Sequence, residues 1–141
     1  MANNLYGNQF IEKLVSSGYK SPIYAMAEII DNSVDAKAKK INITFVEEQR
    51  LEGGRNSRFV SDVFFVDDGS GMNLNQINGC LRFADGAGRA NDRIGTFGIG
   101  LPTSSIYVGR RVEVYSKDIT TGKWYFVYLD LDEQILREEP G

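Results

Sequence analysis

Apolar residues recur with helical spacing in the first quarter of the chain. Residues 9–17 place their apolar side chains on one side of a short helix, which Gly18 would end. A second helix follows, which Ser21 can cap and Pro22 can begin. We therefore expect two helices before the first strand.

Alternating and unbroken apolar runs predict the strands. Residues 41–46 alternate as in a half-buried strand, and residues 63–66 form the unbroken run typical of a strand buried on both faces. Between them, residues 49–58 are polar and contain glycine, which predicts a loop. Residues 111–116 and 124–131 alternate again, and a hairpin turn is expected between them.

The middle of the chain is rich in turns. Residues 67–72 predict a glycine-rich turn, and residues 73–83 a helix. Residues 84–93 contain two glycines, two arginines and no large apolar side chain, which predicts a mobile loop. A short helix is expected to open near Pro102 and to stop by Gly109.

Composition narrows the possible functions. The 141 residues are 42% hydrophobic and 25% charged, as in one ordinary globular domain. The net charge of −3 gives no basic footprint for nucleic acid. The absence of histidine excludes a Ser-His-Asp triad and a histidine metal ligand. A single cysteine, Cys80, cannot form an internal disulfide and fits a reducing compartment. With no signal peptide or membrane-length apolar run, we expect a cytoplasmic protein.

The second helix carries an acidic stripe. At about 100° per residue, Glu28, Asp31, Asn32 and Asp35 share one arc of the helix. The opposite side is apolar and consists of Ile23, Met26, Ile30 and Val34. A solvated acidic face is one interpretation. A bound magnesium ion is the other, since it would relieve the repulsion between neighbouring carboxylates.

Glycines gather between Gly69 and Gly100, where eight of the fifteen lie. Such turns either cradle a phosphate or nucleotide, or are simply tight turns beside a mobile loop. The chain has no G-x-x-x-x-G-K-[ST] loop, and GTFGIG has its glycines in the reverse order of the dinucleotide fingerprint. The two common nucleotide-binding folds are therefore disfavoured.

Three segments stand in a characteristic order: EIIDNSVDA from Glu28, DDGSGM from Asp67, and GTFGIG from Gly95. They resemble the three motifs of the GHKL ATPases, the superfamily of gyrase B, heat-shock chaperone, histidine kinase and MutL domains. The wording of the first two is most similar to the MORC and MutL branch. The resemblance spans residues 9–117.

The resemblance implies an α+β fold, a two-layer α/β sandwich of the Bergerat type with helices on one face of a mixed sheet. ATP would lie between the layers. Residues 1–141 would be the N-terminal part of one such ATP-binding domain, truncated at the C-terminus.

The resemblance also implies roles for single residues. Glu28 would be the catalytic base that activates water, Asn32 would hold Mg²⁺ against the phosphates, and Asp67 would accept a hydrogen bond from the adenine amino group. Met72 would lie against the base or in the core, and the arginines of residues 84–93 would contact phosphate or solvent. The other implied cofactor-binding residues are Asp35, Gly69, Gly71, Arg89, Gly95, Thr96, Phe97, Gly98, Ile99, Gly100 and Leu101.

One departure from the family concerns the γ-phosphate. Leu101 and Pro102 follow Gly100 where relatives often carry a lysine, so no cation for that phosphate is evident. We expect residues 1–141 to bind ATP or ADP but to turn over negligibly as a monomer, so that hydrolysis requires sequence beyond Gly141, a second subunit, or both. ATP binding is expected to promote a homodimer through residues 84–93 and through regions partly outside this chain. Two alternatives remain: a non-hydrolysing, nucleotide-gated interaction module, and a histidine kinase catalytic domain. The kinase normally has asparagine at the position of Glu28.

Overall fold

The computed structural model describes residues 16, 21–82, 100–133 and 135–140. In chain order, the elements are α2 (Pro22–Asp35), β1 (Ile41–Glu52), β2 (Arg55–Asp67), α3 (Leu74–Cys80), α4 (Gly100–Val108), β3 (Arg111–Lys117), β4 (Trp124–Asp130) and β5 (Ile135–Arg137). The helix expected over residues 9–17, except Ser16, and the loop expected over residues 84–93 lie outside the described residues. None of the described helices is both long and apolar enough to cross a membrane.

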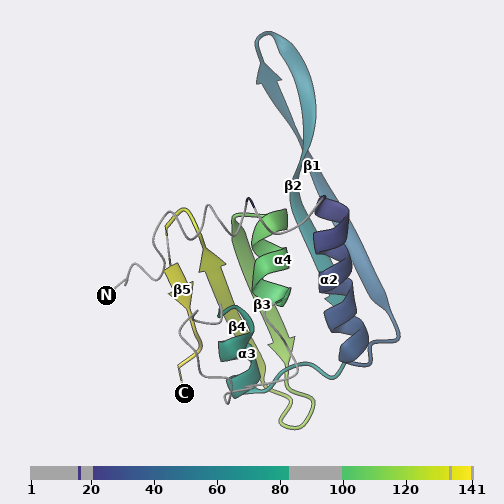
Figure 1. Ribbon diagram of the computed structural model, residues 1–141, viewed down its shortest axis with the longest axis vertical. Coiled ribbons are helices and arrows are strands. Elements are labelled where there is room, and N and C mark those ends of the chain that lie inside the picture. The colour runs from purple at the N-terminus through teal and green to yellow at the C-terminus, as the bar shows by residue number, and fades with distance from the viewer. Residues whose placement is uncertain (1–15, 17–20, 83–99, 134, 141) are drawn as a thin grey trace.

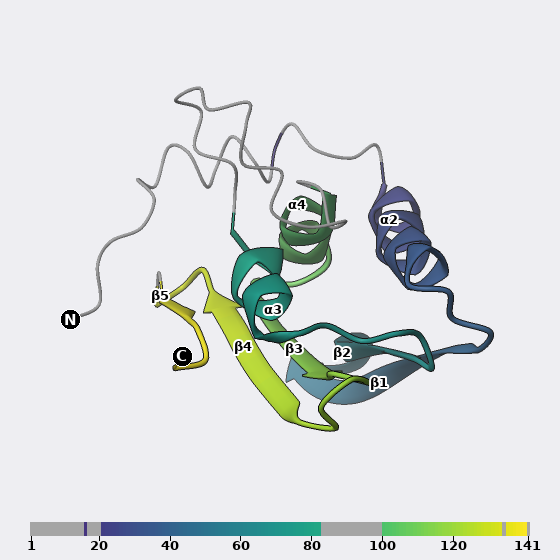
Figure 2. The same cartoon turned by 90° about the horizontal axis from the view of Figure 1, so that it is seen from below.

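The elements form two layers, with the three helices on one side of the strands (Figures 1 and 2). The predicted two-layer α+β arrangement is therefore confirmed. Every pairing between described strands is antiparallel, in two ladders of order β1-β2 and β3-β4-β5 rather than in one mixed sheet. Helix α2 lies over the first ladder and contacts α4, whereas α3 lies over β4.

The prediction of a loop over residues 49–58 is wrong. These residues continue β1 and β2 into a long twisted hairpin that projects from the body of the molecule (Figure 1). Its turn is Gly53–Gly54, with φ of +56° and +79°, and Glu52 pairs directly with Arg55. Two consecutive residues at positive φ suit the right-handed twist of a two-residue hairpin. The polar composition reflects the exposure of this arm on both faces.

The apolar run in β2 predicted a strand buried on both faces, and this prediction is wrong. Phe64 and Val66 are 53% and 57% exposed, whereas Val63 and Phe65 are half-buried. Because successive side chains of a strand point to opposite faces, only the face toward α2 is covered among the described residues.

Helix α2 buries a different face from the one predicted. Its buried residues are Ala25 and Ser33, with Ile29 against the core, while Ile23 and Val34 are 76% and 55% exposed. Helix α2 packs against α4, and Ser33 contacts Asp67 of β2. These neighbours, rather than hydropathy, decide which side of α2 is buried.

The core lies between the other helices and the second ladder. Its buried side chains include Ile77 on α3, Leu81 directly after α3, Ile106 on α4, and Val127 and Leu129 on β4. Helix α3 begins with a capping box between Asn73 and Gln76. It ends at Cys80, earlier than predicted, and β5 was not predicted.

Candidate functional site

The first and second sequence motifs meet where α2 and β2 end. The Ser33 hydroxyl on α2 donates to Asp67 Oδ2 at the end of β2 over 2.7 Å, and the backbone N–H of Gly69 donates to Asp67 Oδ1 over 2.8 Å. Ser70 N–H donates to the carbonyl of Ala36 over 2.9 Å. Asp67 itself remains exposed, so its carboxylate is held in place and still accessible.

Asp68 stabilises the same junction through hydrogen bonds, a role that the sequence analysis missed. One carboxylate oxygen accepts from the backbone N–H groups of Lys39 and Lys40 over 2.7 and 2.8 Å. These two bonds, led by the one from Lys40, lower the pKa of Asp68 below its ordinary value. These bonds span 29 and 28 positions of sequence, so no local pattern reports them.

Gly71 is explained by its approach to β3. Its φ is +66°, and a methyl group added there would lie 1.8 Å from the carbonyl oxygen of Lys117. The next residue, Met72, donates its backbone N–H to the Ser116 hydroxyl over 2.8 Å. Met72 is 8% exposed and belongs to the hydrophobic core, so its contact with a base stays a prediction.

Glu28 lies against the start of α4. A methyl group added to Gly100 would lie 3.3 Å from Glu28 Oε2, so the first motif reaches the last glycine of the third. Glu28 is exposed and Gly100 is half-buried. Leu101 is 9% exposed and points into the core instead.

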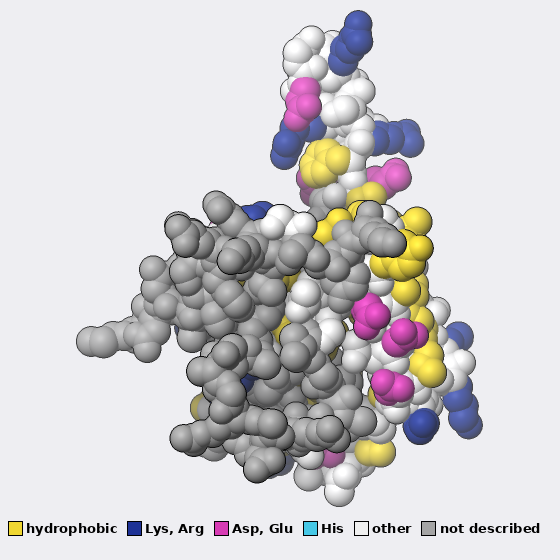
Figure 3. Space-filling view, viewed as in Figure 1, with side chains coloured by type: hydrophobic (Ala, Val, Ile, Leu, Met, Phe, Trp, Pro, Cys, Tyr) yellow, Lys and Arg dark blue, Asp and Glu magenta, His cyan; other side chains and the backbone are white. Residues whose placement is uncertain are grey.

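Asn32 lies in the same helix turn as Glu28. Its Nδ2 donates to the Glu28 carbonyl over 2.8 Å, which leaves Oδ1 as the atom that could ligate a metal ion. The acidic side chains form a stripe on the surface of α2 (Figure 3), where Glu28, Asp31 and Asp35 are all exposed. Within the described ranges, no three carboxylate or cysteine groups are close enough to hold a metal by themselves.

Several predicted site residues fall outside the described residues. They are Arg89, Gly95, Thr96, Phe97, Gly98 and Ile99, together with the rest of residues 84–93. The described part of the site therefore consists of the helix α2, the turn after β2 and the start of α4.

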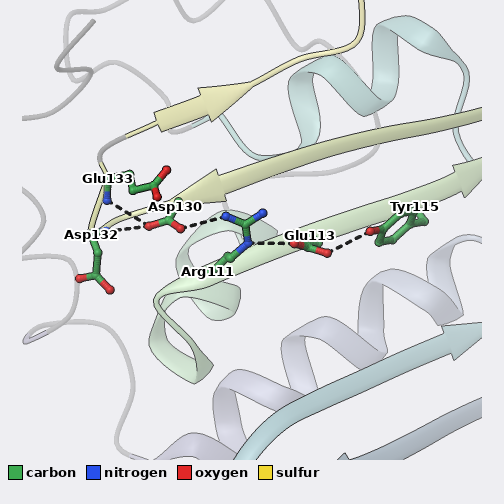
Figure 4. A network of polar contacts seen from close by, with 6 residues as sticks. All are labelled: Arg111, Glu113, Tyr115, Asp130, Asp132 and Glu133. Carbon is green, nitrogen blue, oxygen red and sulfur yellow. Dashed lines mark hydrogen bonds and ion pairs between the residues drawn. The ribbon is translucent and has the colours of Figure 1, made fainter. Parts of the chain in front are cut away.

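A second polar cluster lies on β3 and β4 (Figure 4). The guanidinium of Arg111 donates to Glu113 and Asp130 over 2.8 and 3.0 Å, and the Tyr115 hydroxyl donates to Glu113. Arg111 lowers the pKa of Glu113 through the hydrogen bond between them. Its members satisfy one another, so this cluster stabilises the strand pair and offers no unpaired reactive group among them.

The chain is similar to a set of known ATPases. The family described as "Histidine kinase-, DNA gyrase B-, and HSP90-like ATPase" matches residues 19–137. ATPase MORC2B of Mus musculus is 31% identical over 112 residues, which are 78% of this chain and 10% of that protein. ATPase MORC2 of Homo sapiens is 30% identical over 112 residues, again 78% of this chain and 10% of that protein.

A plant relative extends the similarity. Protein MICRORCHIDIA 1 of Arabidopsis thaliana is 27% identical over 108 residues, which are 77% of this chain and 16% of that protein. The chain spans about a tenth of the length of the first curated relatives that it matches. The family match covers both the α2–β2 junction and the Glu28–Gly100 contact. The chain therefore belongs to the histidine kinase-, DNA gyrase B- and HSP90-like ATPase family, with relatives among the MORC proteins.

Proposed function

We propose that this chain is an ATP-binding, magnesium-dependent ATPase domain in which nucleotide state drives a conformational change or dimerisation. The observation that carries the proposal is the α2–β2 junction, where Asp67 is held by two hydrogen bonds yet remains exposed. Family membership and the names of the MORC relatives support the ATPase activity. We also propose that residues 1–141 are the N-terminal part of this domain.

Asp67 would select the base. The adenine amino group donates hydrogen bonds, whereas guanine presents a carbonyl oxygen at the same place. An ionised carboxylate only accepts, so it attracts adenine and repels guanine. Each oxygen of Asp67 already accepts one bond and has a lone pair left for a second.

Glu28 would be the general base for hydrolysis. A carboxylate is the suitable candidate because the chain has no histidine. Its place beside Gly100 supports this role, since the start of α4 follows the glycine segment that would bind phosphate. Asp35 would help to position the water and the neighbouring loop.

Asn32 fits a magnesium ion. Its free Oδ1 is the hard oxygen ligand that Mg²⁺ prefers, and Mg²⁺ commonly takes only one or two protein ligands beside water and phosphate oxygens. When bound, the ion would neutralise charge on the phosphates. The lack of a carboxylate cage in the described part agrees with this mode of binding.

Calorimetry and phosphate release test the proposal. Replacing Asp67 with alanine should weaken ATP binding at least about tenfold, because the adenine amino group, buried in the complex, loses its acceptor. In the full-length protein, Glu28→Ala should keep ATP affinity within a few-fold and abolish turnover, whereas Asn32→Ala should weaken magnesium-dependent binding itself. Equal affinity of the wild-type chain for ATP and GTP would contradict the assignment of Asp67.

Two alternatives make different predictions. A non-hydrolysing interaction module would bind ATP normally, and Glu28→Ala would leave phosphate release unchanged at every protein concentration. A histidine kinase domain is less favoured because Glu28 stands where that class normally has asparagine. We further propose a cytoplasmic location, supported by the unpaired, buried Cys80.

A further inference from the structure

Ser33 is the polar side chain that α2 buries. It is 6% exposed, and its hydroxyl donates to Asp67 Oδ2 over 2.7 Å, across 34 positions of sequence. An ionised carboxylate has no proton, so the hydrogen in this bond comes from Ser33. A buried serine in a helix commonly donates to a carbonyl of its own helix, as Ser104 does to Leu101 in α4. Ser33 instead donates to another element.

This bond fixes the orientation of the Asp67 carboxylate. The Gly69 N–H holds Oδ1 from the turn, but this single local bond leaves Oδ2 without a fixed position. The second bond, from Ser33, ties Oδ2 to the helix that carries Glu28 and Asn32. Asp67 thereby keeps a fixed position relative to Glu28 and Asn32.

We propose that Ser33 is a positioning residue that sets the base selectivity of this site by holding Asp67 in the orientation that accepts the adenine amino group. The inference rests on the proposed function, because it requires that Asp67 recognises the base. Ser33 would thereby contribute to base recognition through Asp67, without itself contacting the nucleotide.

The test compares ATP with purine riboside 5′-triphosphate, which lacks the 6-amino group. Calorimetry on the full chain with magnesium should show that wild-type protein prefers ATP at least about tenfold. Ser33→Ala should lower the affinity for ATP about three- to tenfold and leave that for the amino-free nucleotide within about twofold. A purely structural role would weaken both nucleotides equally.

Two further serine variants protect the result against loss of folding. Ser33→Cys keeps nearly the same side-chain shape but replaces the hydroxyl with a weak donor, so it should lose selectivity as Ser33→Ala does. Ser104→Ala is the matched control, because Ser104 is also fully buried in a helix and its hydroxyl also makes one hydrogen bond. It should lower the melting temperature and leave the ATP preference unchanged.

The outcomes separate this inference from the proposed function. If Asp67→Ala keeps the ATP preference, or the wild type has none, the assignment of Asp67 in the proposed function is wrong and this inference falls with it. If Asp67→Ala removes the preference while Ser33→Ala and Ser33→Cys keep it, only the role of Ser33 is wrong.

Discussion

Gly71 offers the sharpest test of how the second motif is held. Its replacement by alanine places a methyl group in a left-handed backbone conformation, φ +66°, and 1.8 Å from the Lys117 carbonyl oxygen. The conformational term costs about 1–2 kcal/mol. The steric term costs about 1–3 kcal/mol more, because the obstructing atom belongs to the backbone of β3 and cannot rotate away. We expect Gly71→Ala to lower the free energy of unfolding by about 2–5 kcal/mol.

Gly122 supplies the matched control. Its φ is +73°, almost that of Gly71, but a methyl group there meets no atom within 4 Å. Gly122→Ala should therefore cost only the conformational term of about 1–2 kcal/mol. The difference between the two variants isolates the contact with Lys117 from the backbone strain.

Urea unfolding followed by circular dichroism measures both variants. With an m-value of about 2 kcal/mol per molar urea, the midpoint should fall by about 1–2.5 M for Gly71→Ala and by about 0.5–1 M for Gly122→Ala. Equal losses for the two glycines would refute the argument, because the close approach to β3 would then have no energetic effect.

Three other predictions use the same chain. The backbone N–H groups of Lys40 and Lys39 lower the pKa of Asp68, so its folded-state pKa lies below its unfolded one and its stabilising effect is lost as pH falls. The difference in melting temperature between wild type and Asp68→Asn should be largest at neutral pH. It should disappear as the pH falls below about 4. Burial raises the pKa of the Cys80 thiol to about 12, so mass spectrometry should detect its alkylation at neutral pH only after urea unfolds the protein. Val66→Ala should change the free energy of unfolding by less than about 1 kcal/mol, whereas Val127→Ala, at a 1% exposed position, should cost about 2 kcal/mol or more in the same urea assay.

Local patterns predicted most elements because they depend on nearby residues. The observed bounds of β3 and β4 differ by one residue from the alternation that predicted them, and Pro22 begins α2 as expected. The hairpin arm was missed because its polar residues resemble a loop, although Gly53-Gly54, with positive φ at both residues, is a sequence typical of a two-residue hairpin turn.

The buried face of α2 could not be predicted from hydropathy. Ala25 and Ser33 have small side chains, so they let another element come close. Whether an element lies there depends on the neighbour and not on the helix. The contact between Ser33 and Asp67 joins residues 34 positions apart, so no local pattern reports it. The motifs predict which segments form the site, but the bonds that join those segments are tertiary.

Those bonds also bear on how the site binds. The hydrogen bonds from Ser33 to Asp67 and from Ser70 to Ala36 join the first motif to the second, and those from Lys39 and Lys40 to Asp68 join the segment after α2 to the second motif. Each of them joins two groups of the protein itself. Since immobilising side chains and loops on binding costs affinity, a junction held by its own hydrogen bonds leaves more of the contact energy for the nucleotide. In this chain, the α2–β2 junction would recognise the base in a fixed geometry, and any nucleotide-driven movement would arise outside it.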